Sequence, residues 1–121
     1  MLFHRIGKYT VFIVSLGFIT WQLLTPVPEV QVGGNDKLVH AAAFAWLSLT
    51  THMAFYRQYR YWMIIAVLLC SYGLATETIQ YFVPGRSFSW LDWVADCFGV
   101  LVAYPLFIYI LGLVGCKFQL D

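Results

Sequence analysis

Seven residues of types that bind ligands or transfer protons gather in three short stretches of this chain. In chain order they are Lys37, His40, Glu77, Gln80, Arg86, Asp92 and Asp96. Six of them form pairs spaced three or four residues apart, and this spacing puts both members of a pair on one face of a helix. Imidazole and carboxylate groups transfer protons, whereas lysine and arginine bind phosphate or carboxylate groups. The pattern therefore indicates a site for an anionic ligand.

The seven residues divide into two candidate roles. Glu77 and His40 are the candidate catalytic residues, because an ionisable side chain inside an apolar helix indicates function. The candidate ligand-binding residues are Lys37, Arg86, Gln80, Asp92 and Asp96. Plainer readings stay open at this point: Arg86 as an anchor at the membrane interface, Asp92 as a residue favoured by the helix dipole, and Glu77 as an ion-pair partner.

A metal centre is a weaker reading of the same residues. His40, Glu77 and Asp96 together would supply nitrogen and oxygen ligands for a divalent ion. Lys37, however, is close in sequence to His40, and a lysine ammonium disfavours a second cation nearby. The sequence therefore predicts no metal site, and nothing in it indicates another cofactor.

The composition shows what kind of chain must position these residues. Hydrophobic residues make up 61% of the 121 residues and charged residues only 11%, whereas roughly a quarter of a soluble domain is charged. The formal net charge is +1. A chain so apolar and so nearly neutral is typical of a membrane protein, and no nucleic-acid partner is predicted.

Charged residues divide the chain into four apolar spans, at about 9–28, 38–56, 61–83 and 88–114. Each is near the roughly 20 residues that cross a bilayer, and such spans must be helical because lipid cannot satisfy open backbone groups. The first span is too long for a typical signal peptide and no A-x-A site follows it, so we expect a retained helix. The prediction is an all-α fold: one domain over residues 1–121, a compact bundle of four transmembrane helices.

The distribution of lysine and arginine predicts the orientation of the bundle. The cations at one end of the predicted spans are Arg5, Lys8, Arg57, Arg60 and Lys117. Those at the other end are Lys37 and Arg86. Five against two places both termini in the cytoplasm, so the first and third connections face outward.

With four antiparallel spans, the candidate site residues fall in one layer of the outer leaflet. His40 lies about one turn after the start of the second span, Glu77 lies shortly before the end of the third, and Asp96 follows the start of the fourth. Asp96 also shares a helix face with the small residues Gly99 and Ala103, which suit close contact with a neighbouring helix. We therefore expect the polar faces to point into the bundle.

The stretches "NDKLVHAAAFAWLSL" and "ETIQYFVPGRSFSWLDWVADCFG" resemble the VanZ-like family of bacterial membrane proteins over about residues 35–103. The family pattern runs Lys-x-x-His, Glu-x-x-Gln, Pro-x-Arg, then Asp-x-x-x-Asn leading into a glycine. The residues that match it are Lys37, His40, Glu77, Gln80, Pro84, Arg86, Asp92 and Gly99. Asp96 departs from the pattern, because the family usually has asparagine there.

The resemblance implies a multi-pass protein of the bacterial cytoplasmic (inner) membrane, whose founding relative contributes to resistance against the glycopeptide teicoplanin. Combined with the polar layer, it predicts a site that binds an anionic cell-envelope lipid or a lipid-linked precursor. In this hypothesis Lys37 and Arg86 hold the anionic group, and Glu77 with His40 handles protons or orients the ligand.

Two other functions compete with lipid binding. A membrane-embedded hydrolase or head-group transferase would use Glu77 as a base together with His40. A small transporter is the third hypothesis. It is disfavoured because we expect the deep half of each span to lack polar groups and so to offer no second gate, although a homo-oligomer could supply one. Beyond membrane lipids and a further copy of the chain, the sequence indicates no partner.

Overall fold

The structure, a computed structural model, describes residues 2–26, 36–55 and 61–115. These residues form helices and short connections, with no strand among them. The helices are α1 (Leu2–Leu24), α2 (Asp36–Phe55), α3 (Tyr61–Gln80) and α4 (Trp90–Leu113). The described part of the chain therefore confirms the predicted all-α class and the predicted number of spans.

All four helices are long and apolar enough to cross a membrane. Their bounds follow the predicted spans except at the amino terminus, where α1 begins at Leu2 rather than near residue 9. The difference arises because the predicted span was bounded by Arg5 and Lys8, whereas a helix continues through charged residues into the interfacial region. Residues 27, 28 and 56, at the ends of two predicted spans, lie outside the described residues.

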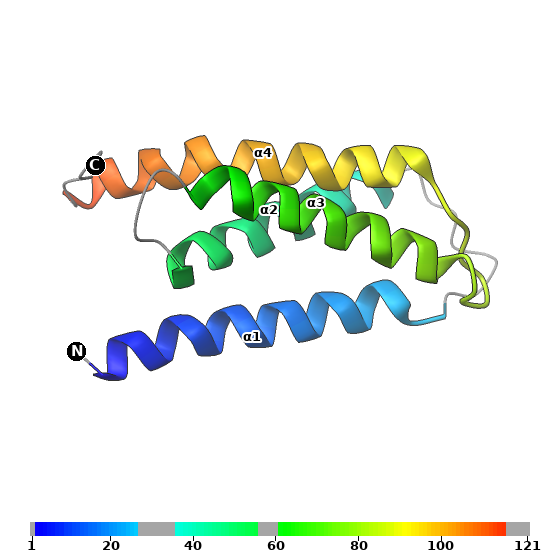
Figure 1. The fold of residues 1–121 in the computed structure, drawn as a ribbon, viewed down its shortest axis with the longest axis horizontal. Coiled ribbons are helices and arrows are strands. Elements are labelled where there is room, and N and C mark those ends of the chain that lie inside the picture. The colour runs from blue at the N-terminus through cyan, green and yellow to red at the C-terminus, as the bar shows by residue number, and fades with distance from the viewer. Residues whose placement is uncertain (1, 27–35, 56–60, 116–121) are drawn as a thin grey trace.

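The helices pack as an antiparallel bundle in which α2 and α4 make the most extensive contact (Figure 1). Within the described residues α1 contacts α2 and α3 but not α4, so it is the most peripheral helix. The start of α1 and the end of α4 lie at the same end of the bundle. Which side of the membrane this end faces stays a prediction, and three cations used for it, Arg57, Arg60 and Lys117, lie outside the described residues.

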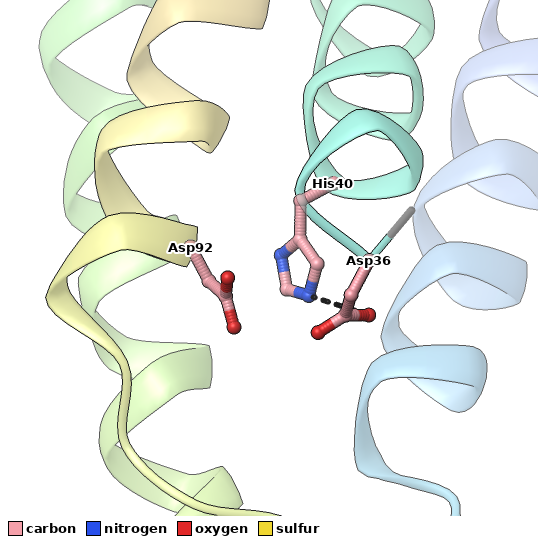
Figure 2. A group of neighbouring side chains, drawn as sticks. All are labelled: Asp36, His40 and Asp92. Atoms are coloured by element: carbon pink, nitrogen blue, oxygen red, sulfur yellow. Dashed lines mark ion pairs between the residues drawn. The ribbon is translucent and has the colours of Figure 1, made fainter. Parts of the chain in front are cut away.

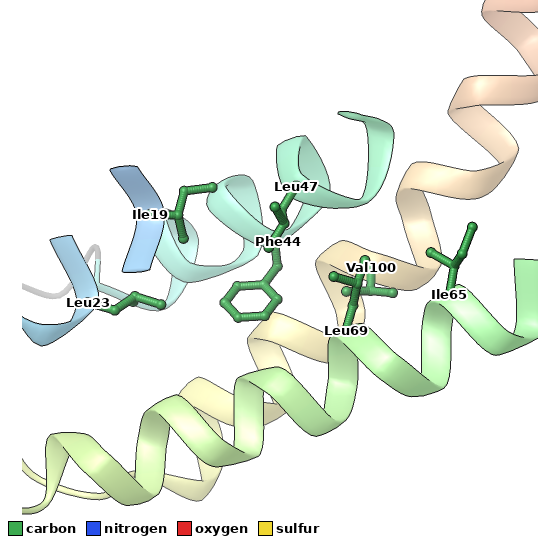
Figure 3. Packing of buried hydrophobic residues seen from close by; sticks show 7 residues of the cluster. All are labelled: Ile19, Leu23, Phe44, Leu47, Ile65, Leu69 and Val100. Atoms are coloured by element: carbon green, nitrogen blue, oxygen red, sulfur yellow. The ribbon is translucent and has the colours of Figure 1, made fainter. Parts of the chain in front are cut away.

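The apolar core lies where all four helices converge (Figure 3). It consists of Ile19, Leu23, Phe44, Leu47, Ile65, Leu69 and Val100. Phe44 and Leu47 of α2 are completely buried. In lipid, close packing of such side chains replaces the hydrophobic effect as the force that holds helices together. The core thus fixes how each helix is rotated about its axis.

Small residues allow the close approach of α2 and α4. A Cβ atom at Gly99 would lie 2.1 Å from the carbonyl oxygen of Ala41 and 3.0 Å from the backbone nitrogen of Ala45. Ala103, one turn further along α4, is completely buried. Gly99 therefore packs against α2, which is the close helix contact that the sequence predicted without identifying the partner. This contact brings the polar residues of both helices within contact distance.

The α3–α4 connection folds through a turn with a clear sequence signature. The backbone N–H of Arg86 donates to the carbonyl oxygen of Val83 at 3.1 Å, and Gly85 between them has a φ of 77°. Proline at the second position and glycine with positive φ at the third are typical of a type II turn. Three residues later Ser89 caps α4, because its hydroxyl accepts from the backbone N–H of Asp92. The turn and the cap set the positions of Arg86 and Asp92.

Candidate functional site: a buried histidine–carboxylate cluster

His40 lies at the centre of a cluster contributed by three helices. Its ring nitrogen Nδ1 is 2.9 Å from Oδ1 of Asp96 on α4, within hydrogen-bond distance. The same nitrogen is 3.7 Å from Oε1 of Glu77 on α3. All three side chains are buried, Glu77 and Asp96 completely. The predicted convergence of α2, α3 and α4 on one polar layer is therefore present in the structure.

The other nitrogen of His40 faces the end of the bundle (Figure 2). Nε2 is 3.9 Å from Oδ1 of Asp36, one turn earlier on α2, whose side chain is 60% exposed. Asp92 flanks the ring from α4, and its Oδ1 is 4.0 Å from Nζ of Lys37. The Lys37 side chain is 56% exposed. The lysine charge thus lies at the rim of the cluster and pairs with Asp92.

Three carboxylate oxygens of this cluster are buried without a hydrogen-bond partner in the described structure: Oε1 of Glu77, Oδ1 of Asp92 and Oδ2 of Asp96. The second oxygen of Glu77 does have one, because Oε2 accepts from the backbone N–H of Ser89 at 3.2 Å. A buried polar atom without a partner costs about 1–3 kcal/mol, and more when the group is charged. The cluster therefore has capacity to bind something more than its own side chains.

Arg86 and Gln80 form their hydrogen bonds with the end of α1. The guanidinium donates from Nε to the carbonyl oxygen of Thr25 at 2.9 Å and from Nη2 to that of Gln22 at 2.8 Å. The amide of Gln80 donates to the carbonyl oxygen of Leu23 at 2.8 Å. The last carbonyls of a helix have no partner within it. Both side chains therefore cap the end of α1 and attach it to the rest of the bundle.

Gln80→Met is expected to lower the free energy of unfolding by about 1–2 kcal/mol, because it leaves the buried carbonyl oxygen of Leu23 without its donor. Thr78→Ala is the control on the same helix, since the Thr78 hydroxyl is exposed and its bond within the described residues is to Leu74 of its own helix. A change within about 0.5 kcal/mol is expected there. Reversible unfolding in mixed detergent micelles measures both variants. Equal losses would show that the Gln80 bond does not hold α1 in place.

A cavity of about 300 Å³ lies between the ends of α1 and α2. Its polar lining comes from Gln22, Asp36, His40 and Arg86. Its apolar lining comes from Phe18, Ile19, Leu23, Val39 and Ala43. Phe18 and Val39 are exposed, so the apolar side opens toward the surface that meets lipid. The cavity thus joins a guanidinium to an apolar surface.

The structure brings together only part of the predicted set. His40, Glu77, Asp96 and Asp92 form the cluster, and Lys37 pairs with Asp92 at its rim. Lys37 does not line the cavity that Arg86 lines, and neither does Gln80. The two cations expected to share one anion therefore point to different places.

Sequence reasoning missed two side chains and one backbone feature. Asp36 precedes His40 by four residues, a spacing that could have suggested it. Ser89 stands three residues before Asp92, which is a recognisable helix-cap pattern. No sequence signal indicated that the carbonyls at the end of α1 would take up Arg86, because that pairing joins residues more than sixty positions apart.

The fold and the cluster define a class: a small multi-pass membrane protein of four helices with buried ionisable residues at one end. A family model described as VanZ/LLP1 matches residues 1–113, nearly the whole chain, and the chain belongs to this family. The match also covers α1, which lay outside the stretch of about 35–103 on which the resemblance was recognised. No curated protein and no solved structure matches the chain.

Proposed function

We propose that this VanZ-family protein binds an anionic cell-envelope lipid, or a lipid-linked precursor, in the outer leaflet of the bacterial cytoplasmic membrane. The observation that carries the proposal is the cavity between α1 and α2, where the Arg86 guanidinium meets apolar walls. Lipids with a phosphate head group combine the same two chemistries. The cavity volume of about 300 Å³ suits a head group and the first part of a chain.

Arg86 keeps binding capacity in spite of its bonds to α1. A guanidinium has five N–H groups, and two of them donate to Gln22 and Thr25, which leaves three with no partner among the described residues. The two bonds also hold the group in place, so that little side-chain entropy is lost when an anion binds. Arginine in this state is well suited to phosphate. Arg86 is therefore the residue that binds the anion, whereas Lys37 pairs with Asp92.

Lipid retention by native mass spectrometry tests the proposal. The probes are phosphatidylglycerol and undecaprenyl phosphate, each competing with phosphatidylcholine in mixed micelles. We expect wild type to retain the anionic lipids selectively and Val39→Trp to lose them at least roughly tenfold, because the indole fills the cavity without touching the Arg86 bonds to α1. Arg86→Ala is expected to lose them as well.

Arg5→Ala is the matched control for the loss of one arginine charge, since Arg5 is exposed at the opposite end of the bundle. It should retain lipid as wild type does. Equal retention by Val39→Trp and wild type would show that the cavity is not the binding site. Loss in Arg86→Ala alone would assign Arg86 a structural role at α1 and would equally overturn the proposal.

A link to glycopeptide resistance extends the same proposal, because VanZ-like relatives include a teicoplanin-resistance protein. If the cavity serves resistance, expression of wild type in a susceptible host should raise the minimal inhibitory concentration of teicoplanin, and Val39→Trp should not. Equal inhibitory concentrations for wild type and Val39→Trp would show that the cavity does not contribute to resistance.

A membrane-embedded enzyme is the second candidate, and the position of His40 favours it. His40 lines the cavity, while its Nδ1 bonds to the buried carboxylate of Asp96, an arrangement that orients an imidazole for acid–base work. Glu77 bonds to Ser89 and does not line the cavity, so the proton-transfer role falls to His40. Release of phosphate from undecaprenyl pyrophosphate by wild type, abolished in His40→Gln, would support turnover; no release by wild type would refute it for this substrate.

A further inference from the structure

The strongest unused feature of the molecule is the inner half of the cluster, where two completely buried carboxylates face one nitrogen of a histidine. We propose that Nδ1 of His40, Glu77 and Asp96 bind a divalent transition-metal ion of the zinc type. The three residues offer ligand atoms that all lie within 4.8 Å of one another. This site is distinct from the proposed lipid cavity, which only His40 of the three residues lines.

The distances within the cluster fit a shared ion. Two atoms that each lie about 2.1 Å from one ion are about 3.0–3.4 Å apart in octahedral or tetrahedral coordination. Nδ1 of His40 is 2.9 Å from Oδ1 of Asp96 and 3.7 Å from Oε1 of Glu77. A common ion would draw Oε1 of Glu77 a few tenths of an ångström closer to Nδ1. It would also bring the two carboxylate oxygens, which lie within 4.8 Å of each other, to the same spacing.

The unpartnered oxygens point to a missing ligand independently of these distances. Oε1 of Glu77 and Oδ2 of Asp96 are buried and have no hydrogen-bond donor in the described structure. Their side chains are essentially inaccessible, at 1% and 0% exposure. Isolated buried carboxylates are costly in an apolar interior unless they are paired or coordinate a metal. A cation bound by Oε1 of Glu77 and by both oxygens of Asp96 would satisfy the two unpartnered atoms.

Charge supports the same conclusion. Lys37 is the cation that led the sequence reasoning away from a metal, but its ammonium lies at the rim and pairs with Asp92. Arg86 bonds to carbonyls of α1. With His40 neutral, the two inner carboxylates carry a formal charge of −2, which a divalent ion neutralises.

The surrounding groups would hold the ligands in orientation. Ser89 donates to the second oxygen of Glu77, so the free oxygen is turned toward His40. Asp36 lies beside Nε2, where it can accept the ring N–H of a histidine that ligates through Nδ1. A carboxylate at the far nitrogen is a recurrent support for metal-bound histidine. A ligand set that includes an imidazole favours zinc or iron over magnesium and calcium.

A second group of the same cluster is the weaker choice. Asp36, His40 and Asp92 also offer ligand atoms within 4.8 Å of one another (Figure 2). Asp36 is more than half exposed, however, and Asp92 already pairs with Lys37. An ion there would compete with water and with the lysine, so the inner group carries the proposal.

Zinc content of the purified full-length chain tests the site. The protein, freed of any histidine tag, is stripped with a chelator, loaded with Zn²⁺, desalted and analysed by elemental mass spectrometry. We expect about one zinc ion per chain in wild type. His40→Gln and Glu77→Gln should weaken retention by at least roughly 100-fold, because each removes a ligand, and Asp96→Asn by roughly 10–100-fold.

His52→Gln is the matched control. His52 is a second buried histidine of α2, packed on the rings of Tyr104 and Phe107 instead of on carboxylates. It should retain zinc as wild type does. Val39→Trp should also retain zinc. A variant that blocks the lipid cavity but keeps the metal therefore tests the two proposals independently. Zinc retention by His40→Gln and Glu77→Gln equal to that of His52→Gln would overturn the proposal.

X-ray absorption of zinc-loaded wild type decides the question even where a variant does not fold. The proposal requires a nitrogen–oxygen shell at about 2.0–2.1 Å that includes an imidazole. A shell at about 2.3 Å would identify cysteine sulfur and exclude this site. Folded wild type that retains no zinc would also overturn the proposal.

Discussion

Gly99→Ala is expected to lower the free energy of unfolding by about 3 kcal/mol, near the upper end of the usual cost of overpacking. The new Cβ would lie 2.1 Å from the carbonyl oxygen of Ala41, far inside the van der Waals contact distance of carbon and oxygen. The obstacle is backbone rather than a side chain that could rotate away, so α2 and α4 must move apart. Reversible unfolding in mixed micelles, followed by tryptophan fluorescence, measures the loss.

Gly112→Ala is the control, because Gly112 lies on the same helix and a Cβ there meets nothing within 4 Å. Alanine is the better helix former by about 1 kcal/mol, so this variant should be neutral or slightly stabilised. The contrast isolates the helix–helix contact from helix propensity. If the two variants unfold within about 0.5 kcal/mol of each other, α2 and α4 do not pack as closely at Gly99 as described.

His40→Leu is expected to cost about 3–5 kcal/mol, because it leaves a buried carboxylate without its hydrogen-bond partner. The substitution deprives Asp96 of its hydrogen bond and leaves Glu77 beside it, so two buried carboxylates lose their shared partner. Asp96→Asn should cost much less, because an amide oxygen can still accept from Nδ1–H. The measurement is made with a chelator present, so that metal binding does not contribute.

The double variant His40→Leu/Asp96→Asn determines how much of this cost comes from the interaction between His40 and Asp96. In an Asp96→Asn background, His40→Leu should cost at least about 1.5 kcal/mol less than it does alone, since one charge is already absent. His52→Leu serves as the control: it removes a buried histidine of α2 whose described neighbours are Tyr104 and Phe107. A coupling energy below about 0.5 kcal/mol would show that His40 and Asp96 do not interact as described.

Asp96 stands where VanZ-like sequences usually have asparagine. The oxygen that accepts from His40 is available in either residue. What aspartate adds is a negative charge and a second oxygen, Oδ2, which is buried without a partner. The departure from the family pattern therefore leaves the hydrogen bond in place and increases the capacity of the cluster for a cation.

The amino-acid sequence by itself determined the helices and the layer in which the site lies. Runs of about twenty apolar residues cross a bilayer as helices, because a helix satisfies its backbone hydrogen bonds within a single segment. Antiparallel order then brings the start of α2, the end of α3 and the start of α4 to one end of the bundle. The small residues on the face of Asp96 correctly indicated that this face points inward. Only a glycine at position 99 permits the contact with Ala41, because any Cβ there would collide with the Ala41 backbone.

The tertiary structure alone decided which polar groups pair. Lys37 and Arg86 were expected to act on one anion, yet Lys37 reaches Asp92 and Arg86 reaches the carbonyls of Gln22 and Thr25. Gln80 likewise bonds to α1, which carried none of the predicted site residues. These pairings depend on how each helix is rotated and on where α1 ends, and both are set by packing between distant parts of the chain. Spacing along one helix specifies a face, but only the neighbouring helix determines what that face meets.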